Sequence, residues 1–187
     1  MRSALSIIDA EHRGYATVLR ALMRHLEPVR ARREAPNHDL FATILAYADT
    51  FMERFHHPKE DEHLFRAVRG RTDEADAVLQ ELQHDHARGP SELRGLREAL
   101  ARARNGIAAD INAFAHRLER YVVDQEAHMR TETDVVLPVA RRVLTATDWQ
   151  TIDHAFRGHS DPFFGTGQGR SGSLFTSMYG FAPPDPR

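Results

Sequence analysis

The spacing of apolar residues along residues 3–144 is the feature that most constrains the fold. Apolar side chains recur there at alternating spacings of three and four, which is typical of helices that bury one face. The helix formers Ala, Leu, Arg and Glu dominate this stretch, and runs of β-branched residues are scarce. The pattern predicts four long helices, over about residues 3–27, 38–69, 72–104 and 110–144. Four long helices with short connections predict an all-α fold, an antiparallel up-down-up-down four-helix bundle.

Stop signals and capping residues set the expected helix ends. Pro28 is expected to end the first helix, because its ring removes a backbone hydrogen bond and crowds the preceding turn. Thr72, which two acidic residues follow, is expected to cap the third helix. Residues 147–150 match a capping box and predict a short fifth helix that ends near Arg157.

Prolines and a change of composition set the remaining boundaries. Pro58, Pro90 and Pro138 lie inside expected helices, and each should kink its helix or end it early. The bundle is expected to occupy residues 1–165. Residues 166–187 are rich in Gly, Ser and Pro and are expected to form a flexible C-terminal tail. The alternative is that the aromatic residues of this tail dock on the bundle or on another subunit.

Charge and composition exclude several classes of function. Lys and Arg number 25 against 27 Asp and Glu, and this near-neutral balance argues against binding nucleic acid or an anionic membrane through bulk charge. The absence of Cys excludes disulfides, thiolate zinc sites and iron–sulfur clusters. No apolar run is long enough to span a membrane, and the N-terminus turns acidic at Asp9, so a cytoplasmic location is expected. The 12 histidines point to metal or proton chemistry.

Each of the four apolar seams contains one histidine, and two seams contain a glutamate one turn later. These six residues are His12, His56, Glu60, His86, His128 and Glu132. The same phase analysis places His84 about 200° from His86 around the helix, so His84 is expected to face solvent. His57 also falls outside the seam of its helix, whereas His63 is borderline because it continues the stripe of His56 and Glu60.

The four seam histidines are expected at one depth in the bundle. Each lies about 15 to 18 residues from the same end, or roughly 22–27 Å at 1.5 Å per residue. Burying two carboxylates without compensating charge costs several kcal/mol each, and no Lys or Arg occupies the seams at that level. The sequence therefore predicts a bound cation at this level.

The spacing His-x3-Glu occurs twice, at His56–Glu60 and at His128–Glu132. A spacing of four puts both side chains on one helix face, so two such glutamates from facing helices can each bridge two metal ions. Imidazole and carboxylate donors without thiolate suit iron or manganese, with zinc possible. The six residues and an oxo or hydroxo bridge leave about two of twelve coordination positions open for water or substrate. Tyr121 and Gln125 are candidates to contact the ligands, with ordinary core packing the equal alternative for Tyr121.

Several of these segments resemble a known family. Residues 55–65 (FHHPKEDEHLF), the pair Glu11-His12, and residues 85–89 and 128–132 are similar to the ligand segments of the hemerythrin-like HHE cation-binding family, and residues 161–165 are similar to the end of its bacterial members. The resemblance covers about residues 3–165. It implies a four-helix bundle that holds a non-haem di-iron centre, with His12, His56, Glu60, His86, His128 and Glu132 as ligands.

The chain departs from the oxygen-carrying hemerythrins in two places. Their third helix offers two histidines four apart, but here Leu82 and Pro90 flank His86 at that spacing. Their last helix supplies an Asp, whereas Glu132 takes that role here and residue 133 is Thr. With one histidine fewer, His63 or water is expected to fill the vacant position.

Three functions remain open at this level. The first is a di-iron protein that binds O₂ or NO, in sensing, storage or stress response. The second is an enzyme that uses the same two irons to reduce NO or peroxide, or that supports iron homeostasis and iron–sulfur repair; the absence of a Cys relay weakens this alternative. The third is a helical module for iron buffering or interaction, in which the metal is mainly structural.

Overall fold

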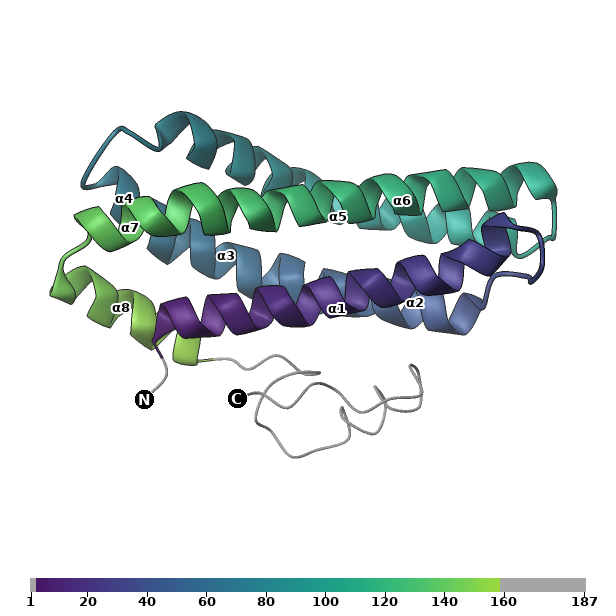
Figure 1. Ribbon diagram of the computed structural model, residues 1–187, viewed down its shortest axis with the longest axis horizontal. Helices are drawn as coiled ribbons and strands as arrows, with labels where there is room; N and C mark the ends of the chain where they lie inside the picture. The colour runs from purple at the N-terminus through teal and green to yellow at the C-terminus, as the bar shows by residue number, and fades with distance from the viewer. Residues whose placement is uncertain (1–2, 159–187) are drawn as a thin grey trace.

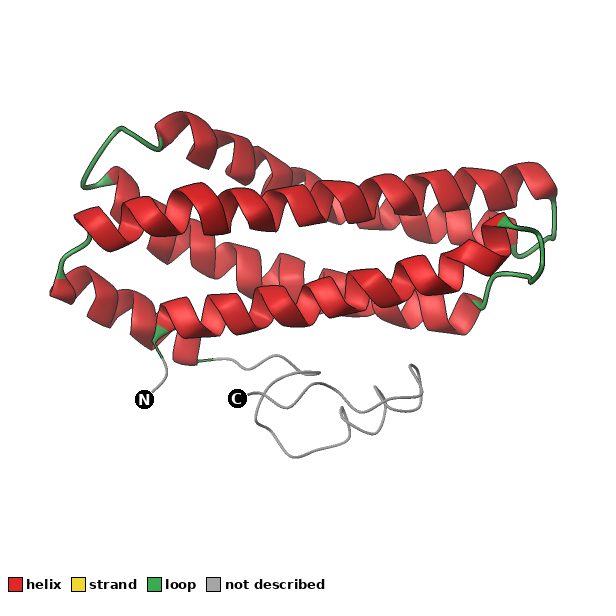
Figure 2. Cartoon of the chain, in the orientation of Figure 1, coloured by secondary structure: helices red, strands yellow, loops and turns green. Residues whose placement is uncertain are grey.

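All regular structure in the described part of the chain is helical. The computed structural model describes residues 3–158, and no strand occurs among them (Figure 2). The boundary expected at residue 165 and the tail at 166–187, with its docking alternative, lie outside the described residues. None of the helices in residues 3–158 is both long and apolar enough to cross a membrane.

Five helical rods make up the described chain, and two of them change between α-helical and π-helical turns along their length. The segments in chain order are α1 (Ala4–Arg30), α2 (His38–Tyr47), η1 (Ala48–His56), α3 (His57–Lys59), η2 (Glu60–Phe65), α4 (Arg66–Arg69), α5 (Asp76–Ala103), α6 (Ala108–Thr131), η3 (Glu132–Val136), α7 (Leu137–Val143) and α8 (Ala146–Arg157).

The long rods lie side by side in a helical bundle. α5 packs against α6 and α2, and α1 packs against α6 and α8. The connections from α1 to α2 and from α5 to α6 lie at one end of the bundle, and the connection from α4 to α5 lies at the other (Figure 1). α8 covers the end that contains the start of α1, where the Asp153 carboxylate accepts a hydrogen bond of 2.6 Å from the Ala4 N–H.

The apolar core of residues 3–158 consists of two clusters rather than one. The first surrounds residues such as Tyr15 and Phe114, towards the α1–α2 connection. The second surrounds residues such as Ile8, Phe65 and Phe156, beneath α8. In each of the four long rods, the seam histidine lies at the boundary between residues of the first cluster and residues of the second. A polar layer therefore divides the apolar core across the full width of the bundle.

Two expected helix ends were wrong by a few residues. α1 continues past Pro28 to Arg30, because a proline in the last turn removes only one backbone hydrogen bond. α5 begins at Asp76, since the Thr72 hydroxyl accepts from the Glu74 N–H in a separate turn. α5 also runs without a break through Pro90.

The fifth helix has its capping box two residues earlier than expected. The Thr145 hydroxyl accepts a hydrogen bond of 3.3 Å from the Asp148 N–H, and the Asp148 carboxylate accepts one of 2.8 Å from the Thr145 N–H. α8 accordingly begins at Ala146 instead of following a cap at Thr147. An Asp at the third helical position serves this motif in the same way as the Glu or Gln that the sequence pattern requires.

The π turns change which residues face the core. A turn closed by hydrogen bonds from residue i to i+5 holds more residues than an α turn, so the buried face moves along the sequence. The spacing of three and four, continued from His128 and Glu132, places Val135 on the buried face, but Val135 is 39% exposed and its neighbour Val136 in η3 is fully buried. The same effect in η1 buries both His56 and the adjacent His57. Pro58 and Pro138 each follow one of these π turns.

Candidate metal centre

The structure brings the four seam histidines together in two pairs. His12 on α1 and His56 at the end of η1 approach with their Nε2 atoms 3.0 Å apart. His86 on α5 and His128 on α6 approach with their Nε2 atoms 2.9 Å apart. All four side chains are buried. The equal depth that the sequence predicted is therefore found as direct contact across the bundle.

Glu60 and Glu132 lie between the two histidine pairs and face both of them. One carboxylate oxygen of Glu60 lies 3.3 Å from the Nε2 of His56, and the other lies 3.9 Å from the Nε2 of His86. One oxygen of Glu132 lies 3.2 Å from the Nε2 of His12, and the other lies 3.3 Å from the Nε2 of His128. Each carboxylate thus presents one oxygen to each pair.

This donor set fits a cation. Glu60 and Glu132 are almost completely buried, and none of their four carboxylate oxygens has a hydrogen-bond partner within the described residues. Buried carboxylates without hydrogen bonds are strongly unfavourable unless a positive charge compensates them. Two groups within the cluster have ligand atoms within 4.8 Å of one another: His12, His56 and Glu60, and separately Glu60, His86 and Glu132. The residues can therefore hold metal ions.

Three acidic side chains contact the outer nitrogens of the histidines. Glu11 lies 2.7 Å from the Nδ1 of His56, and Asp61 lies 3.0 Å from the Nδ1 of His86. Asp85 lies at a longer distance, 3.5 Å, from the Nδ1 of His128. The hydrogen bond to Glu11 fixes the tautomer and the ring orientation of His56, so that its Nε2 is left for a metal. The Nδ1 atoms of His86 and His128 have no hydrogen-bond partner among the described residues, so Asp61 and Asp85 act on them through charge.

These three acids are functional residues that sequence reasoning missed. Each adjoins a predicted ligand in the sequence: Glu11 precedes His12, Asp61 follows Glu60, and Asp85 precedes His86. In the structure, however, each acid contacts a histidine from a different rod. The adjacency was a usable signal, but the sequence does not show which histidine each acid contacts.

The comparison with protein families agrees with this site. Residues 3–140 match the model of the hemerythrin HHE cation-binding domain. The chain belongs to the hemerythrin HHE family. Its resemblance to that family is thus confirmed over residues 3–140, and the family gives a cation as the expected occupant of the cluster. No curated protein and no solved structure matches the chain.

The electrostatics of this HHE centre raise the pKa of His12, His56 and His128. Burial lowers the pKa of His56, but Glu60 and Glu11 outweigh burial and raise it to about 10. Burial also lowers the pKa of His128, but the nearby Glu132 outweighs burial and raises this pKa to about 9. The pKa of Glu132 is held well below its usual range despite burial, because His128 and His12 lie beside it. A cation must displace these protons, so binding is coupled to proton release.

Lys59 is the one buried lysine of the described residues, and it does not pair with the central carboxylates. Its Nζ lies 3.6 Å from Glu11 and 4.7 Å from the centre of the Phe156 ring on α8. It therefore compensates Glu11, the acid that orients His56. These contacts agree with the expectation that no Lys or Arg side chain from the seams pairs with Glu60 or Glu132.

The structure corrects the placement of His57. The sequence predicted that His57 lies outside the seam, but it is only 4% exposed and its ring stacks on His86, with centroids 4.1 Å apart and planes 11° apart. The π turn of η1 causes this difference. His57, His86 and His128 form a third group with ligand atoms within 4.8 Å. His63, in contrast, is half-buried and belongs to none of the three groups, and His84 is exposed as expected.

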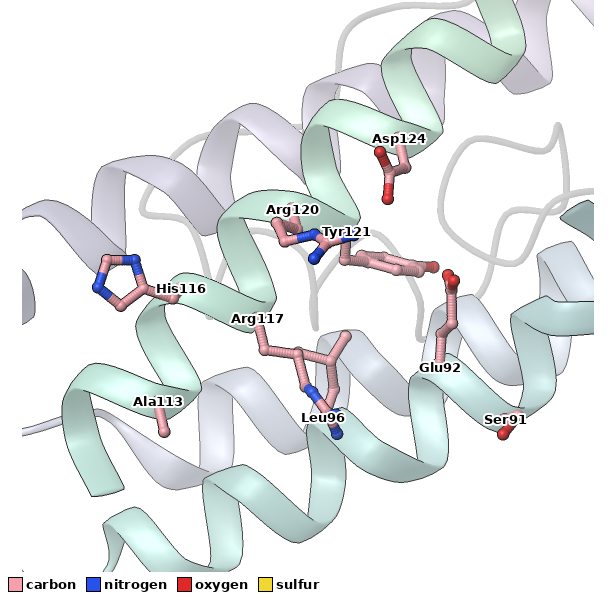
Figure 3. A pocket seen from close by; sticks show the side chains of 9 residues that line it. All are labelled: Ser91, Glu92, Leu96, Ala113, His116, Arg117, Arg120, Tyr121 and Asp124. Carbon is pink, nitrogen blue, oxygen red and sulfur yellow. The ribbon is translucent and has the colours of Figure 1, made fainter. Parts of the chain in front are cut away.

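Tyr121 and Gln125, the two candidates to contact the ligands, are both buried, and Tyr121 also lines a surface cavity. The Tyr121 hydroxyl lies 2.5 Å from the Tyr15 hydroxyl, and Gln125 is buried with its Oε1 unpartnered among the described residues. Figure 3 shows the Tyr121 ring reaching from α6 towards Glu92 on α5, at a cavity of about 500 Å³. This cavity is lined by none of the six cluster residues.

A second cavity between the same helices reaches the centre itself. It encloses about 350 Å³ and is lined by His128 together with Asp85, Arg88 and Asp124. His128 therefore borders a solvent-accessible space. A small molecule or ion can approach the cluster from this side of the bundle.

Proposed function

We propose that this chain holds two iron ions at the centre and binds O₂ or NO there. The observation that carries the proposal is the two-sided arrangement of Glu60 and Glu132, each with one oxygen towards either histidine pair. In this proposal His12 and His56 hold one ion, His86 and His128 hold the other, and the two glutamates bridge them. We also propose that the four long rods run antiparallel, in the up-down-up-down arrangement of a four-helix bundle.

The distances support two ions rather than one. Adjacent donors of one ion with metal–nitrogen bonds near 2.1 Å are about 3 Å apart. The Nε2 atoms of His12 and His56 are 3.0 Å apart, and those of His86 and His128 are 2.9 Å apart. Nitrogen and carboxylate donors without thiolate favour iron or manganese, with zinc the less favoured occupant.

The protein supplies orientation and a dry environment. Glu11 holds the His56 ring by a hydrogen bond at its outer nitrogen, and Asp61 and Asp85 place negative charge beside the outer nitrogens of His86 and His128. The two apolar clusters lie on either side of the polar layer and exclude water from it. Iron with open coordination positions supplies the capacity to bind a diatomic molecule. Two imidazoles and two carboxylate oxygens for each ion leave such positions, and the cavity at His128 gives access to them.

Elemental analysis and a gas titration test this function. We expect two irons per chain in protein purified from its native host, and we expect the reduced protein to give stable optical bands when titrated anaerobically with NO or with O₂. Turnover of NO or peroxide would instead favour the enzyme. Absence of any spectral change in iron-loaded protein would favour iron buffering.

A matched pair of variants tests the ligand assignment. His86→Ala removes a proposed ligand, whereas His84→Ala removes an exposed histidine of the same helix. We expect the first variant to lose iron and the second to keep two irons per chain. Unchanged iron in His86→Ala together with halved iron in His84→Ala would overturn the assignment.

A further inference from the structure

The cavity of about 500 Å³ between α5 and α6 lies outside the metal centre. None of the six cluster residues lines it, and its lining includes two buried side chains, Leu96 of α5 and Tyr121 of α6. Small-molecule sites in proteins commonly enclose a volume of this order and combine an apolar floor with a few polar groups. The question is therefore which molecule the polar groups of this cavity suit.

Two arginines on one face of α6 line the cavity. Arg117 and Arg120 are three residues apart, so their side chains leave the helix on the same face. Neither guanidinium has an ion-pair or hydrogen-bond partner among the described residues. Like charges one turn apart repel each other, and an anion between them removes this repulsion. The two arginines therefore offer a place for a negatively charged group.

Gly95 of α5 leaves room for one of these guanidinium groups. A Cβ atom at Gly95 would overlap the Nη1 of Arg117, so any larger residue would displace the guanidinium. Figure 3 shows the Arg117 side chain reaching from α6 towards α5, beside Leu96. The positive charge of Arg117 is thus placed at the α5 side of the cavity, next to the apolar floor.

The acidic residues of the cavity do not cancel its positive charge. Glu92 accepts a hydrogen bond of 2.9 Å from Arg88, which does not line the cavity, so the charge of Glu92 is already compensated. Asp124 is exposed and forms an ion pair with neither arginine of the cavity. Among the described lining residues, two guanidinium groups therefore stand against one uncompensated carboxylate, and the cavity favours an anion.

We propose that this cavity binds a small molecule in which a phosphate or carboxylate group is joined to a flat apolar body. Arg117 and Arg120 bind the anionic group, because the planar guanidinium presents donors that match the oxygens of either anion. Leu96 and the ring of Tyr121 contact the apolar body. No residue of the metal cluster takes part, so the proposal stands apart from the proposed function.

Calorimetric titration of the full chain with four probes tests the proposal. Phenyl phosphate and benzoate each join an anion to a flat ring, whereas inorganic phosphate and phenol each supply only one half. We expect one molecule of an aromatic anion per chain, and at least about 10-fold weaker binding of either half. The tighter of the two aromatic anions identifies the anionic group as phosphate or carboxylate. Absence of binding by both aromatic anions up to about 10 mM would overturn the proposal.

Variants of the arginines test which groups bind the anion. Arg117→Gln and Arg120→Gln should each weaken binding by about 10-fold, because each removes charged hydrogen bonds to the ligand. Arg102→Gln is the control, since Arg102 is an exposed arginine of α5 that does not line the cavity, and it should change the affinity by less than about 2-fold. Equal affinity in the wild type and in both cavity variants would show that the arginines do not bind the anion, and the proposal would fail.

A second pair of variants separates the cavity from surface charge alone. Ala113 lines the cavity, whereas its exposed neighbour Asn112 does not. Ala113→Phe fills part of the cavity without a change of charge and should weaken binding by at least about 10-fold, and Asn112→Phe should leave it unchanged. Equal binding by these two variants would contradict the proposal. So would an aromatic anion that shifts the optical bands of bound iron and binds every variant equally, because that anion is held at the metal centre.

Discussion

Gly89 and Gly95 lie in the same helix, α5, and we expect the same substitution to have opposite effects at the two positions. Glycine inside a helix costs about 0.5–1 kcal/mol relative to alanine, so Gly→Ala is usually stabilising. At Gly95 the added Cβ meets only the guanidinium of the exposed Arg117, a flexible group that can move away. Gly95→Ala should therefore raise the free energy of unfolding by up to about 1 kcal/mol, or the melting temperature by about 2–4 °C.

At Gly89 the added Cβ overlaps the buried carboxylate of Glu53. Moving that carboxylate breaks its contact with His57. Burial raises the pKa of Glu53 to about 7, so above this pH Glu53 is charged, and a hydrogen bond to a charged group contributes about 1.5–3 kcal/mol. After the helix gain of up to about 1 kcal/mol is subtracted, Gly89→Ala should lower the free energy of unfolding by about 0.5–2 kcal/mol. Thermal and urea unfolding of the two variants, in the same state of metal loading, measures the difference.

A double-mutant cycle identifies the cause of the loss. Pro90 follows Gly89 and restricts a preceding residue that carries a Cβ, which is a second source of destabilisation. If Glu53 is the cause, Gly89→Ala should cost much less in a Glu53→Ala background, with a coupling of more than about 1 kcal/mol. The reasoning would be refuted if Gly89→Ala stabilised the protein at least as much as Gly95→Ala. It would also be refuted if Gly89→Ala lowered the free energy of unfolding equally in the wild type and in the Glu53→Ala background.

Two further predictions concern stability. In the folded protein the pKa of His56 is about 10 and that of His128 about 9, and both exceed the ordinary value of 6.5. In chelator-treated protein these two histidines therefore contribute their full stabilisation below pH 6.5, and this stabilisation is lost as the pH rises through 9–10. The melting temperature should fall over this window in wild type and less in His56→Gln; equal slopes would contradict the assignment. Thr145→Ala should cost about 1 kcal/mol, because it removes a helix cap, whereas Thr147→Ala should change stability little, as urea unfolding would show.

The sequence predicted the helical fold and the six central residues because both depend on helical periodicity. An apolar stripe with a spacing of three and four places four histidines on the buried faces of their helices, however the helices pack: His12, His56, His86 and His128. Their equal depth followed from the helix lengths alone. Iron as the metal, and the ligand roles of the six residues, stay predictions.

His57 could not be found in this way because the phase analysis assumes 3.6 residues in every turn. The π turns of η1 change that number just before His57, and the sequence carries no marker for them other than Pro58 in the following turn. Glu11 and Asp85 were adjacent to predicted ligands, but their partners lie on other rods, and such pairings depend on side-chain placement. The cap at Thr145 was missed because the box at residues 147–150 satisfied the same pattern.

The polar layer also affects how the protein unfolds. Apolar contacts join the residues of each core cluster, but across the layer the connection consists of charged and polar side chains, which separate at much smaller cost in water than buried hydrocarbon does. Cations at the layer would tie all the long rods together and make melting a single cooperative event. After their removal, the two ends of the bundle become separate foldons that can open at different temperatures.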